Sequence, residues 1–182
     1  MKKLLIGLTL LGCLLLVACA KTQTQSESTT ASFKVVEEKE QTESYRYTQD
    51  VDGFSQEIIE TVTYKGEAFK TLKLELRQPL NDETKTMIAS QGLESLKPNL
   101  IKAIEEETVI QQLKAVAGVS VSVDVPNETD MVVVVSIDMT TADLTALSKV
   151  EGIGFDFTAL EDTTPADYIS QLKSLGATQV KQ

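Results

Sequence analysis

The sequence predicts an α+β fold in which a curved antiparallel sheet of about five strands packs against two to four helices. Residues 43–77 alternate between apolar and polar side chains with turn signals between them, which predicts a meander of three strands. Residues 82–117 place apolar side chains three and four positions apart, which predicts helices. A second alternating stretch, residues 119–139, predicts a hairpin.

The meander is expected to contain strands over residues 43–51, 56–64 and 68–77. The third strand shows the pattern most clearly, because Leu72, Leu74 and Leu76 alternate with charged residues. Asp52-Gly53 and Lys65-Gly66 mark the two turns. One face of this sheet should therefore be buried and the other should meet water.

Two helices are expected between the meander and the hairpin. Asn81 is suited to cap the first, over residues 82–90, and Gly92 to end it. The second should begin close to Pro98, because proline is tolerated only in the first helical turn, and should end near Ala117-Gly118. Its apolar positions are Leu100, Ile104, Ile110, Leu113 and Val116.

The hairpin and two further helices complete the expected fold. Valine and serine alternate from Val119 to Val125, residues 126–130 form a turn, and the chain returns from Met131 to Met139. A short helix should run from Thr140 or Thr141 to Val150. Thr164 begins a last helix as its capping residue, with proline following it, and Gly176 ends it.

The N-terminus has the pattern of an export signal. Lys2 and Lys3 precede fifteen mostly apolar residues, 4–18, which are too few for a membrane-spanning helix of about 20 residues. The run ends in Leu16-Val17-Ala18-Cys19, which resembles the lipobox of bacterial lipoproteins. We expect cleavage between Ala18 and Cys19, residues 1–18 being the signal peptide, and a diacylglyceryl group on the Cys19 thiol. The alternative is an ordinary secretory signal in which Cys19 is incidental.

These features predict three segments and a location. Residues 19–43 form a lipidated cysteine and a polar tether with little apolar content, and residues 44–182 form one domain. The protein should lie on the extracytoplasmic face of a bacterial membrane, and we favour a Gram-positive cell membrane. The membrane is then a partner through the lipid anchor alone.

Charge limits the partners. The chain has a formal net charge of −10, and without Lys2 and Lys3 it keeps 15 basic against 27 acidic side chains, or −12. Nucleic acid is not expected as a partner, because phosphate binding requires clustered cations. Anionic lipid should repel the domain as well.

Few residues offer catalytic chemistry. The chain has no histidine, and both cysteines, Cys13 and Cys19, precede the domain. Catalysis that uses histidine or cysteine, and metal sites that use either residue as a ligand, are therefore excluded from the domain. No cofactor is expected. Gly152-Ile153-Gly154 is interpreted as a turn, and Tyr45 with Tyr47 as half-buried core or, alternatively, as an aromatic binding platform. Carboxylates remain as candidates for acid–base work or cation binding: Glu105, Glu106, Glu107, Asp124, Glu128, Asp130, Asp156, Glu161 and Asp162.

The order of these elements resembles the YehR-like family of small bacterial lipoproteins of unknown function. The resemblance covers most of residues 44–180. It rests on the lipobox and tether, a strand pair ending in residues 62–67, a Gly118-Val119 entry into a hairpin that ends at Ile137-Asp138, and the helix from Tyr168 to Gly176. It implies an α+β fold and supplies no catalytic residues.

Three functions are compatible with the sequence. We favour a non-enzymatic lipoprotein that binds or scaffolds an envelope protein, a peptide or a glycan. The first alternative is an envelope enzyme that uses carboxylates, such as a glycan hydrolase. The second is a small solute-binding accessory protein, although solute receptors are usually longer.

Overall fold

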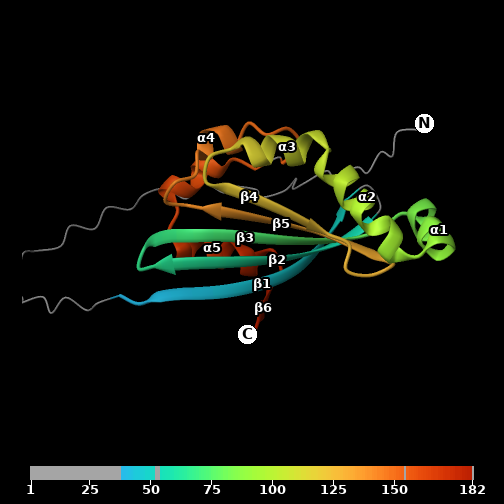
Figure 1. The fold of residues 1–182 in the computed structure, drawn as a ribbon. Coiled ribbons are helices and arrows are strands. Elements are labelled where there is room, and N and C mark those ends of the chain that lie inside the picture. Colours follow the sequence, from blue (N-terminus) through green and yellow to red (C-terminus); the bar gives the residue numbers. More distant parts are fainter. Residues whose placement is uncertain (1–37, 52–53, 154, 182) are drawn as a thin grey trace, which may run out of the picture.

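The computed structural model describes residues 38–51, 54–153 and 155–181, and these form one antiparallel sheet with helices (Figure 1). The sheet order is β4-β5-β3-β2-β1-β6, and every pairing is antiparallel. The strands are β1 (Glu40–Val51), β2 (Phe54–Lys65), β3 (Ala68–Pro79), β4 (Val119–Asp124), β5 (Asp130–Asp138) and β6 (Thr178–Val180). The helices are α1 (Asp82–Gln91), α2 (Leu93–Glu105), α3 (Thr108–Ala115), α4 (Leu144–Leu147), the 3₁₀ helix η1 (Phe157–Asp162) and α5 (Pro165–Ser174).

The predicted fold class is confirmed, and the sheet has a sixth strand that the sequence did not indicate. β6 has only three residues and pairs with β1 over Ser44–Arg46, which is too short for an alternating pattern to be recognised. β1 begins at Glu40, three residues before the expected start and inside the segment assigned to the tether. Within the described residues, no helix has both the length and the apolar character needed to cross a membrane.

The expected helix over residues 98–117 is wrong: two helices, α2 and α3, occupy this region. The chain is extended at Glu107, between them. Ile110 follows Ile104 by six residues, which in one unbroken helix would place it about 120° away around the axis. The break lets both side chains enter the core, where each is at most 2% exposed.

Pro98 lies in the second turn of α2, so the expectation that it begins the helix is also wrong. The side chains of Pro98 and Glu94 are both exposed. Pro98 has no backbone N–H, so the backbone carbonyl of Glu94, four residues earlier, lacks its helical hydrogen bond. Water can reach that carbonyl, which explains why the helix continues.

The remaining helices follow the sequence in part. α1 and α5 are confirmed, with caps at Asn81, which accepts from Thr84 N at 2.8 Å, and at Thr164, which accepts from Asp167 N at 3.2 Å. The expected helix from Thr140 to Val150 is reduced to one turn, α4, which is capped by Asp143. The 3₁₀ helix η1 was not predicted.

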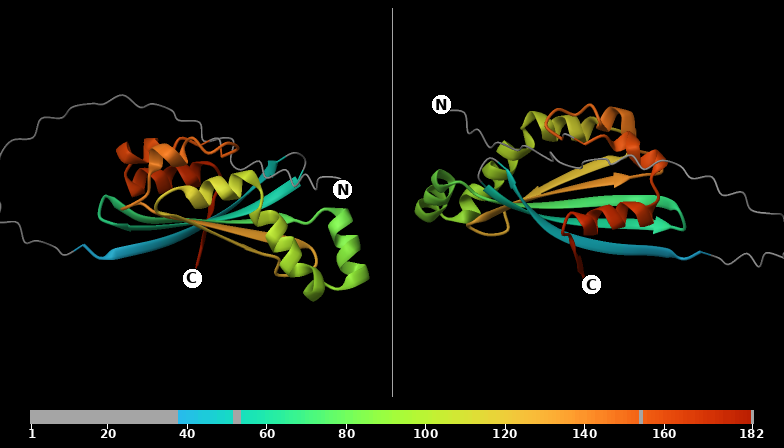
Figure 2. Two further views of the ribbon diagram at one scale, coloured as in Figure 1. Left: turned by 45° about the horizontal axis from the view of Figure 1, so that its top comes forward. Right: turned by 180° about the vertical axis from the view of Figure 1, so that it is seen from behind.

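The helices cover one face of the sheet. Figure 2 shows α3, α4 and α5 on the same side, while no helix of the described residues lies on the other side of β1, β2 and β3. Cross-strand pairing aligns the inward side chains in rows, and one such row contains Val62, Leu72 and Ile137, each at most 1% exposed. The helix-free face is mainly polar. One of its cross-strand rows consists of Thr42, Thr63 and Thr71, and another consists of Ser44, Thr61, Lys73 and Ser136.

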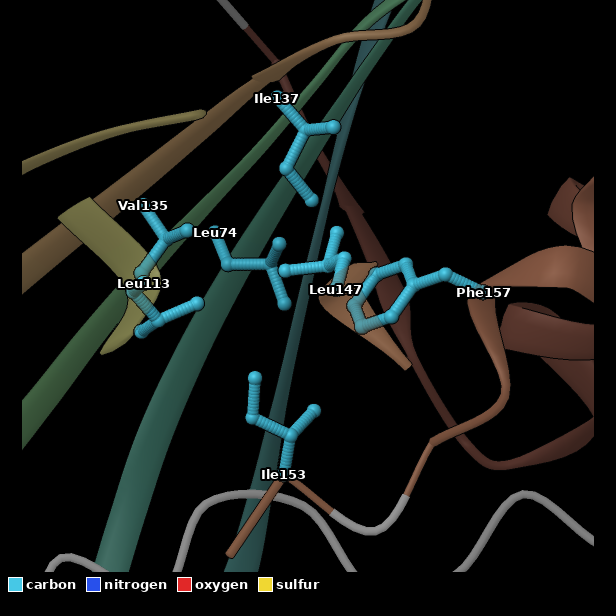
Figure 3. Close-up of a pocket in the computed structure, with 7 residues that line it drawn as sticks. All are labelled: Leu74, Leu113, Val135, Ile137, Leu147, Ile153 and Phe157. Carbon is cyan, nitrogen blue, oxygen red and sulfur yellow. The ribbon is translucent and has the colours of Figure 1, made fainter. Parts of the chain in front are cut away.

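Side chains of the described residues pack closely between the sheet and the helices. A small cavity of about 20 Å³ lies among them, and the side chains around it point toward one another (Figure 3). Its lining is entirely apolar, so a water molecule there would find no hydrogen-bond partner. The cavity is therefore a small packing gap and not a ligand pocket. Its walls are Leu74, Leu113, Val135, Ile137, Leu147, Ile153 and Phe157.

Candidate functional site

The most unusual polar feature of the core is a cluster of two glutamates and four tyrosines, which we call the Tyr–Glu cluster. The chain has four tyrosines, and the hydroxyl of each donates a hydrogen bond to Glu43 or Glu60. The tyrosines are Tyr45, Tyr47, Tyr64 and Tyr168.

Strand register brings most of the cluster together. Tyr45 lies directly opposite Glu60 in the β1–β2 pair, and Glu43 lies opposite Val62, so all four side chains are on the helix-covered face. Tyr168 comes from α5, which packs across this face. The phenol ring of Tyr168 also makes an edge-to-face contact with Phe69 at 5.7 Å between centroids.

Glu60 is a buried carboxylate, only 2% exposed, among apolar neighbours. Tyr168 donates to its Oε1, and Tyr47 donates to its Oε2 at 3.5 Å. Burial raises the pKa of Glu60 to about 7, because the charged form loses its hydration, while the two tyrosine hydrogen bonds oppose that rise. Glu60 therefore exchanges a proton near neutral pH.

Glu43 has the opposite character, because it is partly exposed and well supplied with donors. Its Oε2 accepts from Tyr45 at 2.5 Å and from Gln179 Nε2 at 3.1 Å, and its Oε1 accepts from Tyr64 at 2.7 Å. The hydrogen bonds from Tyr45 and Tyr64 lower the pKa of Glu43. The same carboxylate raises the pKa of Tyr64 to about 12. Glu43 thus stays ionised and joins β1, β2 and β6.

The cluster connects the C-terminal segment to the meander. Lys173 of α5 lies over the Tyr45 ring, 5.4 Å from its centroid, in cation–π geometry. Tyr168 of the same helix binds Glu60, and Gln179 of β6 binds Glu43. Burial is the first cause that raises the pKa of both Tyr45 and Tyr168, so these phenols remain neutral donors.

The cluster can hold and release a proton, but a substrate cannot reach Glu60 in this conformation. General acid catalysis needs the proton within hydrogen-bond reach of the reacting group. The Glu60 carboxyl instead faces two tyrosines inside the protein. The geometry favours a structural role, in which the cluster fixes α5 and β6 on the sheet.

The structure corrects the aromatic platform considered for Tyr45 and Tyr47. Tyr45 is completely buried, and Tyr47 is half-buried against the core. Neither ring is presented on an open surface, because both belong to the inward row of β1. Cys19 and Ala18, the expected lipid-attachment and cleavage residues, lie outside the described residues.

Several of the candidate carboxylates named from the sequence are engaged in local contacts. Asp124 forms an ion pair with Lys97 at 2.8 Å, and Glu105 forms one with Lys114 at 2.7 Å. Asp156 caps η1 by accepting from Thr158 N. In the part of the chain that the structure describes, no group of three or more acidic or cysteine side chains is arranged to hold a metal ion.

The loop between β4 and β5 is organised as a turn. Asn127 Oδ1 accepts from the backbone N–H groups of Thr129 and Asp130, both at 2.8 Å, which is the side-chain bonding typical of asparagine in turns. Gly152 has φ +87° in a turn, as expected, while Gly154 lies outside the described residues.

Glu60 was missed by reasoning from sequence, although a signal was present. It shares its parity with Ile58 and Val62, so it is an acidic residue at an inward position of an amphipathic strand. An inward carboxylate requires buried donors. Nothing in the local sequence indicates Tyr168 as the donor, because it is 108 positions away.

The fold recurs in solved structures. The NMR structure of a protein from Streptococcus pneumoniae TIGR4 is 25% identical, with a TM-score of 0.67, and the match covers 89% of this chain and all of that one. The NMR structure of Escherichia coli YehR is 23% identical, with a TM-score of 0.51, over 79% of this chain and 93% of that one. The second likeness concerns the fold alone.

Sequence comparison extends this likeness to a family. No curated protein sequence matches the chain significantly. A family model matches residues 55–172, which include β2, β3, the helical middle section, the β4–β5 hairpin and most of α5. This match spans more than half of the chain and agrees with the likeness to YehR. The chain belongs to the YehR-like family, whose molecular function is unknown.

Proposed function

We propose that this protein is a lipid-anchored extracytoplasmic lipoprotein whose domain is a non-enzymatic binding module for another protein of the cell envelope. The observation that carries the binding role is the uncovered face of the β1–β2–β3 meander, since the opposite face is closed by helices. The anchor is inferred from the sequence of residues 1–19.

The anchor rests on the length and the end of the apolar segment. Fifteen residues after Lys2 and Lys3 are too few for a permanent span, and the segment ends in Leu16-Val17-Ala18-Cys19. Two acyl chains on Cys19 would bind a bilayer stably, whereas one chain would be marginal. A net charge of −12 gives the mature chain no electrostatic attraction to anionic lipid.

The uncovered face favours a protein partner over a small molecule. It carries a charge ladder in which Glu57 pairs with Arg46 at 3.5 Å and with Arg77 at 3.8 Å. Arginine is enriched in protein interfaces, and serine and threonine hydroxyls beside it can both donate and accept. The four tyrosines point to the other face, so a glycan would find none of them to stack on.

The anchor is tested by Cys19→Ala in the full-length chain. We expect unprocessed precursor or release into the soluble fraction, measured by fractionation and by mass spectrometry of the N-terminus. A matched Cys13→Ala variant should be processed and retained normally. Normal processing and membrane retention of Cys19→Ala would contradict the anchor.

The binding surface is tested by photo-crosslinking in living cells. A photoreactive amino acid at Lys73, exposed at the centre of the uncovered face, should capture a discrete envelope protein. The same amino acid at Gln111, exposed on α3 on the opposite side, is the control. Equal capture from both positions, or none from Lys73, would refute this surface.

A further inference from the structure

The outer side of β4 is a free sheet edge with a defined set of backbone groups. Asp138 N donates to Gly118 O at 2.8 Å, so the backbone of Gly118 points toward β5. Direction alternates along a strand, and the backbone groups of Val119, Val121 and Val123 therefore point away from β5. Val119 N is used by Val116 O at 3.2 Å.

Within the described residues, no strand pairs with this outer side. The N–H and C=O groups of Val121 and Val123 and the C=O of Val119 are consequently available. The other edge of the sheet is less regular, because it consists of the three-residue β6 and the parts of β1 outside Ser44–Arg46. β4 is therefore the longer continuous edge to which a further strand can be added.

The composition of β4 contrasts with the rest of this acidic chain. From Val119 to Val123 it consists of alternating valine and serine, and the terminal Asp124 is neutralised by Lys97 at 2.8 Å. The valines are half-buried on the helix-covered side, and the serines are exposed on the other. The lysines, prolines and inward charges that usually protect edge strands are absent from Val119–Val123.

We propose that β4 pairs with β4 of a second copy of this chain, antiparallel about a two-fold axis at Val121. In this register Val121 faces its own counterpart, and Val119 faces Val123 of the second copy. The two Val121 residues exchange two hydrogen bonds, and each Val123 N–H donates to Val119 O of the other copy. Every free N–H of the edge then has a partner.

Side-chain matching and charge favour a second copy over another segment. The two-fold arrangement places valines beside valines on one face and Ser120 beside Ser122 of the other copy on the opposite face. No charged side chain faces a like charge, although the chain carries −10 overall. The contact is isologous and self-limiting, because each copy has one such edge.

The paired edge is short, so the association should be weak in dilute solution. Six residues a side bury much less than the roughly 1,200–2,000 Å² of stable protein interfaces. Copies held near one another in a cell would pair more readily. The test therefore uses full-length chains in cells and a cross-linker that captures touching groups.

Charge-swap variants test both the contact and its register. One full-length chain carries Ser120→Lys with Ser122→Lys, and the other carries Ser120→Glu with Ser122→Glu. Both serines are exposed, so each variant should fold, as far-ultraviolet circular dichroism of the purified chain can verify. A zero-length carbodiimide then joins an amine to a carboxylate only where the two touch.

Co-expression of the two variants should give on the order of ten-fold more cross-linked dimer than either variant alone, because only the mixture places an amine opposite a carboxylate and because opposite charges attract whereas like charges repel. Peptide mass spectrometry should locate the link between position 120 of one copy and position 122 of the other. A Val121→Pro change on both chains removes the outward N–H and should abolish the link.

Two results would overturn the inference. The first is an equal yield of cross-linked dimer from the mixture and from each variant alone. The second is a link that joins other positions, or that joins β4 to a different protein.

Discussion

Replacing Glu60 by glutamine should change how stability depends on pH. The folded-state pKa of Glu60 is about 7, against its ordinary value of 4.5, because burial disfavours the charged carboxylate. Native protein therefore binds more protons than unfolded protein between these values, and the free energy of unfolding falls as pH rises through this interval. A glutamine side chain still has an oxygen that can accept the hydrogen bond from Tyr168, but it does not ionise as pH rises.

The magnitude follows from the two pKa values. A raised pKa contributes stability that is fully present below 4.5 and is lost as pH rises through about 7. Integration between pH 5 and pH 8 gives a loss of about 2.5 kcal/mol in the wild type from this one group. Between pH 5 and pH 8, the free energy of unfolding of the Glu60→Gln variant should therefore fall by about 2.5 kcal/mol less than that of the wild type.

Urea unfolding at pH 5, 6, 7 and 8 measures this difference, with the slope of the transition checked for constancy. Glu67→Gln is the matched control, because Glu67 is exposed at the β2–β3 turn, where water solvates its charge. The control should follow the wild type. If Glu60→Gln and the wild type lose equal stability between pH 5 and pH 8, the account of Glu60 is refuted.

Three further substitutions test the structure around this core. Tyr168→Phe removes the hydroxyl that donates to Glu60 while leaving the ring, so urea unfolding at pH 8 should show a loss of about 1–3 kcal/mol, smaller at pH 5. Leu147→Ala enlarges the apolar cavity and should cost about 3–5 kcal/mol, whereas a cost below 1 kcal/mol would contradict the close packing seen there. Gly118→Ala should lower the free energy of unfolding by at least about 2 kcal/mol, because Gly118 has φ +74° and a Cβ would lie 2.5 Å from the Ala142 backbone. Wild-type stability in that variant would contradict the tight turn into β4.

The meander and the hairpin could be predicted because their signals are local. Turn residues separate the strands, and inward and outward side chains alternate within each one. Helix α1 was likewise marked at both ends by Asn81 and Gly92. The break between α2 and α3 was not visible as a turn signal, since Glu106 and Glu107 carry none. It shows only in the phase difference between Ile104 and Ile110.

The candidate site was less predictable than the fold. Tyr45 and Tyr47 are recognisable in the sequence as a pair on one face of a strand, and the structure places them with the buried Glu60 and the partly exposed Glu43 on the helix-covered face. Whether two aromatic side chains on one strand face form a surface or a core depends on what covers them. Here the cover is α5, which follows β1 in the sequence by more than one hundred residues.

The sequence by itself determined the class of fold, the inward face of each long strand and the expectation of a lipid anchor at Cys19, because periodicity, turn chemistry and a short motif are local properties. Only the tertiary structure decided that α5 and β6 return to the first strand and that four tyrosine hydroxyls converge on two glutamates. Contacts of this kind depend on register and on helix docking across the whole chain. The proton affinity of Glu60 depends on the same contacts, since its burial is created by side chains distant in sequence.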